Sequence, residues 1–151
     1  MAELKERLRA DLNAAMRARD QVRMRTLRLA LTSITNEEVA GASARDLTDD
    51  EVVRVLTREA RKRREAAEAF SAAGRSDQAA AERAEGEVLA GYLPAQLSDD
   101  ELAALVDAAI AETGASSLSG LGQVMKTVTP RVAGRADGAR VAAEVRRRLS
   151  G

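Results

Sequence analysis

The sequence of 151 residues contains no cysteine, no histidine and no tryptophan, and its aromatic content is 1%. Without cysteine and histidine there can be no disulfide, no zinc site of the Cys/His type and no histidine general base. Phe70 and Tyr92 are the only aromatic side chains, so stacking on nucleic-acid bases is disfavoured. We therefore expect no catalytic residue, no metal site and no cofactor, and the missing cysteines suit a reducing cytoplasm.

Long apolar runs are also missing. No stretch has the length and apolar character of a membrane span, and the N-terminal segment lacks the apolar centre of a signal peptide. We expect a cytoplasmic protein with no membrane partner.

The charges are balanced in number but unevenly distributed. The 24 basic and 24 acidic residues give a formal net charge of zero. Residues 1–35 hold eight basic and four acidic side chains, residues 94–119 five acidic and no basic ones, and residues 120–151 seven basic and two acidic ones. Basic patches at both ends of the chain can meet a polyanion, although a solvated charged surface explains the same pattern.

Apolar residues at helical spacing predict four helices in residues 1–93. The stripe of the first helix comprises Leu4, Leu8, Leu12, Ala15 and Met16. Asp20 is placed to cap the second helix, and Gly74 to end the third. The fourth is expected to run from Ser76 to about Leu93, before Pro94.

Two capping boxes, Leu47–Glu51 and Leu97–Glu101, mark further helix starts. The second box opens a region, residues 97–151, in which the apolar pattern predicts three helices. The middle one is short, and Pro130 is expected to stop it. The sequence thus predicts an all-α fold, with a four-helix N-terminal subdomain (1–93) and a small three-helix C-terminal bundle (97–151).

The stretch 119–138 differs from the rest of the chain because it combines glycines, a proline and isolated cations. Gly134 is free to adopt a positive φ, and Asp137 is placed to cap the last helix. This turn is expected to bring together four cations, Lys126, Arg131, Arg135 and Arg140, beside free backbone amides. Such a set suits a phosphate backbone. The alternative is a tight turn whose glycines serve geometry and whose arginines are solvated.

The residues GLGQVMK at 120–126 and GRADG at 134–138 resemble the C-terminal motif of the GatB/YqeY family. The segments YLPAQLSDDEL at 92–102 and TLRLALTSI at 26–34 are similar to its stand-alone YqeY-like branch. The resemblance covers essentially the whole chain and implies an all-helical fold of four plus three helices.

In that family the same module forms the tail of the GatB subunit of glutamyl-tRNA(Gln)/aspartyl-tRNA(Asn) amidotransferase, where it contacts the tRNA body. A similar module is attached to some glutaminyl-tRNA synthetases. The resemblance implies tRNA binding, or association with an aminoacyl-tRNA synthetase or amidotransferase. The residues carried over are Gly122, Gln123, Lys126, Gly134 and Arg135, and proximity adds Arg131 and Arg140.

The catalytic part of the amidotransferase subunit has no counterpart in this sequence, so we expect no enzyme activity from the chain by itself. One alternative is a protein–protein interaction adaptor without direct RNA contact, which would use the acidic segment 98–112 or the basic face 54–64. Another is an accessory role in carbon–nitrogen ligase activity with glutamine as amido-N-donor.

Overall fold

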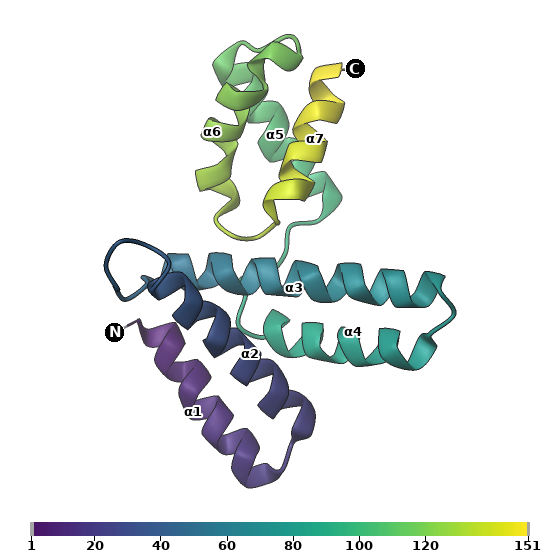
Figure 1. Cartoon of the computed structure of the whole chain (residues 1–151). Helices are drawn as coiled ribbons and strands as arrows, with labels where there is room; N and C mark the ends of the chain where they lie inside the picture. The colour runs from purple at the N-terminus through teal and green to yellow at the C-terminus, as the bar shows by residue number, and fades with distance from the viewer. Residues whose placement is uncertain (1, 151) are drawn as a thin grey trace. The chain divides into compact units, whose positions relative to one another are not determined.

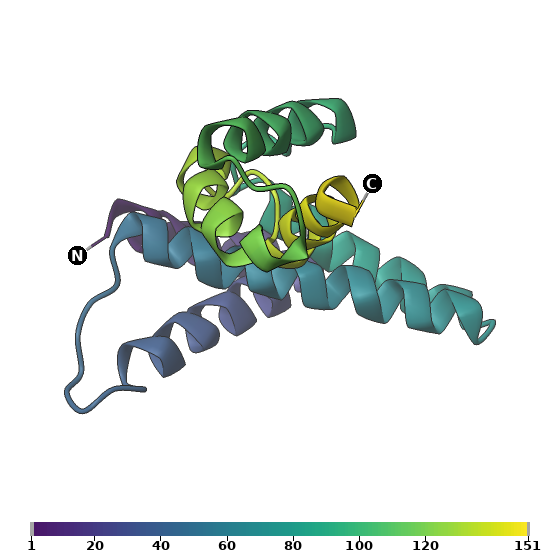
Figure 2. The same ribbon diagram turned by 90° about the horizontal axis from the view of Figure 1, so that it is seen from above.

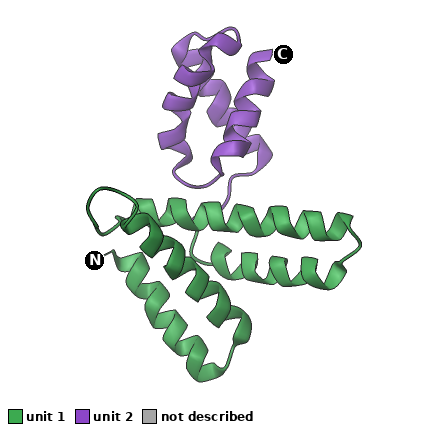
Figure 3. Ribbon diagram, viewed as in Figure 1, with its two compact units in different colours: residues 1–93 green, residues 94–151 purple. Residues whose placement is uncertain are grey.

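A computed structural model describes residues 2–150, in which the regular elements are seven α-helices and one short 3-10 turn, without a strand (Figure 1). The predicted all-α class is confirmed. The chain divides into two compact units, 1–93 and 94–151 (Figure 3). Each unit has its own apolar core.

The first unit consists of two helical hairpins. Its helices are α1 (Glu3–Ala18), α2 (Gln21–Glu38), α3 (Asp49–Ala72) and α4 (Ser76–Ala90). Helices α3 and α4 lie side by side in both views (Figures 1 and 2). The core is aliphatic apart from one tyrosine, and includes Leu8, Leu27, Ile34, Val52, Leu56, Leu89 and Tyr92.

Local capping chemistry explains where these helices begin. The Asp20 carboxylate accepts a hydrogen bond from the backbone N–H of Arg23 at 3.1 Å, as predicted. At α3, Thr48 and Glu51 form the predicted capping box. Helix α1 ends differently, because Arg19 takes up the left-handed conformation with φ of 56°.

The second unit contains α5 (Asp99–Thr113), the 3-10 turn η1 (Leu118–Gly120), α6 (Leu121–Val132) and α7 (Gly138–Ser150). Ser98 and Glu101 form the second predicted capping box. The core is almost entirely aliphatic and includes Leu97, Leu102, Val106, Val124, Val128, Val132, Val141, Val145 and Leu149. With side chains from all three helices in it, this core holds α6 and α7 in the positions on which the candidate site depends.

The prediction that Pro130 stops the short helix is wrong. Pro130 lies inside α6, which continues to Val132. Pro130 has no amide to donate to the carbonyl of Lys126, and its ring crowds that carbonyl, so it weakens the helix at this point. Val128 and Val132 are both buried, so packing of the last turn against the core outweighs that loss.

Two smaller expectations also fail. The fourth helix ends at Ala90 rather than near Leu93, because the chain turns there, with the Tyr92 amide bonded to the carbonyl of Leu89. Met16 does not belong to the buried stripe of α1: it is 45% exposed, while its neighbour Ala15 is 3% exposed. Adjacent residues lie about 100° apart around a helix, and here Ala15 faces the core while Met16 faces solvent.

Candidate functional site

Helix α6 carries four of the predicted site residues on its exposed surface, namely Gly122, Gln123, Lys126 and, in its last turn, Arg131. Val124 and Val128 are buried, and this orientation turns Gly122, Gln123 and Lys126 toward solvent. Gly122 and Lys126 are four residues apart, so they share one face of the helix. Among the described residues, the Lys126 ammonium group has no hydrogen-bonding or ion-pair partner. We call Gly122, Gln123 and Lys126 the α6 face.

The two glycines at the start of α6 have different roles. A Cβ atom at Gly120 would lie 2.7 Å from the Cβ of Ala115, so packing within the unit requires glycine there. A Cβ at Gly122 would meet no atom within 4 Å. Glycine lowers helix propensity, and at this position no internal contact compensates for that cost. The open space above Gly122 allows another molecule to approach the backbone of α6 closely.

The loop after α6 adopts the expected turn. Gly134 has φ of 77°, and Ala133 before it is also left-handed with φ of 50°. The Asp137 carboxylate accepts a hydrogen bond from the backbone N–H of Arg140 at 2.9 Å, so the predicted cap of α7 is confirmed. Asp137 is buried, as is Ala136.

Each of the three predicted arginines has a partner in the first or last turn of α5, or next to it. Arg131 makes a bidentate pair with Glu112, in which Nη2 donates to Oε1 at 2.8 Å. This pair lowers the pKa of the Glu112 carboxyl below its ordinary value. The Arg140 guanidinium donates to Asp99 Oδ1 at 2.8 Å.

Arg135 supports the turn itself. Its Nε donates to the carbonyl of Ala95 at 3.2 Å, and its Nη2 lies 3.9 Å from Glu101 Oε2. Its backbone carbonyl accepts from the amide of Leu97 at 2.8 Å. The pKa of Glu101 is lowered mainly by hydrogen bonds from Ser98, with a smaller contribution from the Arg135 charge. Arg135 therefore joins the loop to the start of α5.

The four cations expected near one another do not form one cluster. Arg135 and Arg140 contact Glu101 and Asp99 in the first turn of α5. Arg131 instead pairs with Glu112 in its last turn. Glu101 and Glu112 are eleven positions apart, which is about 16 Å along a helix axis. Lys126 remains as the one cation of the set without an acidic partner in the described part of the chain.

Sequence reasoning missed the role of α5 as the acidic partner of this motif. A clue was present, because residues 94–119 hold only acidic charges and residues 120–151 mostly basic ones. Opposite charges on consecutive segments of one small bundle favour internal pairing.

Within residues 2–150, no group of three or more acidic, cysteine or histidine side chains is arranged to hold a metal ion. None of the helices in the same residues has the length and apolar character needed to span a bilayer.

Comparison with known proteins identifies the family. The model of the family described as Yqey-like protein matches residues 5–149, which is nearly the whole chain. None of the curated proteins matches the chain. The motifs at 120–126 and 134–138 and the two capping boxes lie within the matched region. The chain belongs to the family of YqeY-like proteins.

Proposed function

We propose that this chain is a tRNA-binding helical module that works with an enzyme of aminoacyl-tRNA metabolism and has no catalytic activity by itself. Its membership in the YqeY-like family supports the proposal. So does the resemblance of residues 120–126 and 134–138 to the tRNA-contacting tail of the amidotransferase GatB subunit. The observation that carries it is the unpaired, exposed Lys126 on the α6 face.

The α6 face has the chemistry that a phosphate backbone requires. Lys126 supplies a positive charge, and Gln123 supplies an amide that can donate or accept a hydrogen bond. Gly122 leaves the space for close approach. Tyrosine and phenylalanine occur once each, and neither lies in the second unit. Recognition would therefore depend on the backbone and shape of the RNA rather than on stacking with its bases.

Measurement of tRNA binding over a range of salt concentrations tests the proposal. We expect Lys126→Ala to weaken binding and to reduce the slope of log affinity against log salt by about one. Arg146→Ala is the matched control, because Arg146 is an exposed cation of the same unit, outside the motif. Equal affinity of the wild type and Lys126→Ala for tRNA would contradict the assignment of the site.

One observation favours a protein-interaction adaptor instead. Arg131, Arg135 and Arg140 are all engaged with groups in or next to α5, which leaves fewer cations for phosphate. A pull-down from nuclease-treated extract distinguishes the two functions. Protein partners that persist without RNA, combined with no binding of purified tRNA, would favour the adaptor. Hydrolysis of glutamine or ATP by the purified chain would contradict the proposed absence of catalysis.

A further inference from the structure

The connection between α1 and α2 carries three arginines without acidic partners. Arg17 lies in the last turn of α1, Arg19 in the connection, and Arg23 in the first turn of α2. Arg17 and Arg19 are exposed and Arg23 is half-buried. None of their side chains has a hydrogen bond or ion pair to the described residues. We call these three residues the basic corner.

The carboxylates near the basic corner are already engaged. Asp20 caps α2 by accepting from the Arg23 backbone amide. Asp11 accepts a hydrogen bond from the Tyr92 hydroxyl and lies 3.9 Å from Arg7. The three guanidinium groups of the corner therefore carry positive charge that the unit does not neutralise by pairing.

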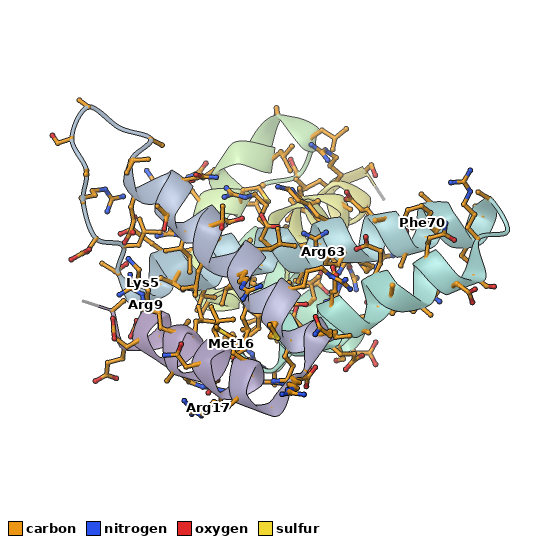
Figure 4. All side chains as sticks on the ribbon, turned by 60° about the horizontal axis from the view of Figure 1, so that its bottom comes forward. Lys5, Arg9, Met16, Arg17, Arg63 and Phe70 are labelled. Carbon is orange, nitrogen blue, oxygen red and sulfur yellow. The ribbon has the colours of Figure 1, made fainter. Side chains whose placement is uncertain are left out.

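Several other arginines of the same unit are paired with acidic side chains. Arg63 of α3, labelled in Figure 4, lies within 3.6 Å of carboxylate oxygens from three different glutamates. Arg25, two residues beyond the corner, donates to Glu85 at 2.8 Å. Other single arginines of this unit are also unpaired within the described residues, but the corner places three of them within seven consecutive positions, 17–23.

The backbone at Arg19 adds a second observation. Arg19 is left-handed, with φ of 56° and ψ of 35°, a conformation that glycine adopts without steric cost. Glycine occupies this region at positions 74, 114 and 134. Among residues 2–150, Ala133 is the only other non-glycine residue with positive φ. At the α1–α2 connection, Arg19 therefore occupies a backbone conformation that favours glycine.

We propose that the basic corner is a second phosphate-binding surface, which contacts the backbone of structured RNA. This inference rests on the proposed tRNA-binding function and adds a contact from the first unit. Guanidinium groups bind phosphate oxygens in a bidentate manner, and all three cations of the corner are arginines. Among the described residues, Met16 is the one large exposed apolar side chain within 16–23, so this stretch does not supply the apolar centre of a protein interface.

The test uses the full chain, a tRNA transcript as probe and two matched double variants. Arg17→Ala/Arg19→Ala removes two charges from the corner. Arg54→Ala/Arg83→Ala removes two exposed arginines of α3 and α4 that also lack side-chain partners among the described residues. We expect the corner variant to lose on the order of tenfold in affinity. The slope of its log affinity against log salt should fall by an amount that corresponds to one to two phosphate contacts. The control variant should bind like the wild type.

The outcomes separate this inference from the proposed site on α6. Loss with Lys126→Ala but not with the corner variant would overturn the inference and leave the α6 assignment standing. Loss with the corner variant alone would support the inference and contradict the α6 assignment. Absence of tRNA binding by the wild type would overturn both.

A competition experiment tests the chemical class of the ligand. Polyglutamate carries carboxylates in place of phosphates. If it displaces the tRNA transcript as effectively as unlabelled RNA of equal charge, the assignment to phosphate is overturned. Displacement by RNA alone supports it.

Discussion

Two nearly identical pentapeptides begin helices in the two units, and their environments differ. Leu47–Glu51 precedes and enters α3, and Leu97–Glu101 does the same for α5. Both leucines are buried, and both capping boxes have the hydroxyl and carboxylate contacts that define the motif. The local geometry of the start is therefore shared.

The two motifs differ in the group that accepts a hydrogen bond from the backbone amide of the leucine. In the second unit, Leu97 donates to the backbone carbonyl of Arg135. In the first unit, Leu47 donates to the buried carboxylate of Glu38 at 3.3 Å. Glu38 is held in turn by Lys5, whose Nζ lies 2.7 and 2.9 Å from its two oxygens.

The first aspartate of each motif repeats this contrast. Asp49 accepts from the backbone amide of Leu4 at 3.1 Å, whereas Asp99 accepts from the side chain of Arg140. A single local motif thus connects to the rest of each unit in a different way. The first unit depends at this point on a buried ion pair, and the second on a backbone carbonyl that does not titrate.

The largest expected effect comes from removing one partner of the buried pair. Lys5→Met should lower the free energy of unfolding of the first unit by about 3 kcal/mol, because Glu38 is left buried and charged. Urea unfolding followed by tyrosine fluorescence measures this, since the only tyrosine, Tyr92, lies in the first unit.

The double variant Lys5→Met/Glu38→Gln is the control. It removes both charges and keeps an acceptor for the Leu47 amide, so it should recover most of the lost stability. If Lys5→Met alone unfolds at the same urea concentration as the wild type, the contrast between the two motifs has no energetic basis.

Lowering the pH is expected to have a smaller effect on the stability of the first unit. The hydrogen bond from Lys5 lowers the pKa of Glu38 below its ordinary value of 4.5. A carboxylate with a lowered folded-state pKa stabilises the fold above its unfolded pKa, and this contribution disappears as the pH falls through the folded pKa. The first unit should therefore lose stability as the pH falls below about 4.5.

Comparison of the wild type with Glu38→Gln isolates this contribution. The variant should lose less stability over the same pH interval, because its residue 38 does not titrate. Burial raises the pKa of Tyr92 to about 12, so its phenol stays neutral throughout the measurement. Identical acid dependence of the two proteins would show that Glu38 does not contribute to it.

The capping contacts that the two motifs share predict equal losses of stability when either one is removed. Thr48→Ala and Ser98→Ala each remove the side-chain acceptor of a capping box and should each cost about 1 kcal/mol. Tyrosine fluorescence reports Thr48→Ala, and far-ultraviolet circular dichroism reports both variants. A much larger loss at one position would show that tertiary contacts, rather than local capping, determine the value.

The smallest effect is expected from the exposed arginine pairs of the second unit. Arg131→Gln and Arg140→Gln should leave the urea midpoint nearly unchanged, because exposed ion pairs contribute little to stability. Circular dichroism measures this in the full chain. A large loss of helicity would mean that the pairs with Glu112 and Asp99 hold the bundle together.

Features encoded by neighbouring residues were predictable from the sequence. Both capping boxes, the cap at Asp20, the cap at Asp137 and the positive φ of Gly134 all follow from residue types within a few positions. Apolar spacing was equally informative for the last helix, where Val141, Val145 and Leu149 are all buried as expected.

Features that depend on distant residues were not predictable. Lys5 and Glu38 each lie at helical spacing from a buried apolar residue, Leu8 and Ile34 respectively. They are 33 positions apart, so the sequence does not show that they pair with each other. The partners of Arg131 and Arg140 lie on α5, so proximity in sequence misleadingly suggested one cluster of cations. The prediction that Pro130 stops the helix failed for a related reason. Val132 packs on the core, and its burial extends the helix past the proline.

Pro130 also has a consequence for hydrogen exchange in α6. A proline has no amide, so the carbonyl of Lys126 receives no helical hydrogen bond from position 130. The last turn is then attached to the helix by fewer bonds than the turns before it, and it opens at a lower free-energy cost. Deuterium uptake should therefore begin at residues 131–133, while the amides around Val124 remain protected by the core.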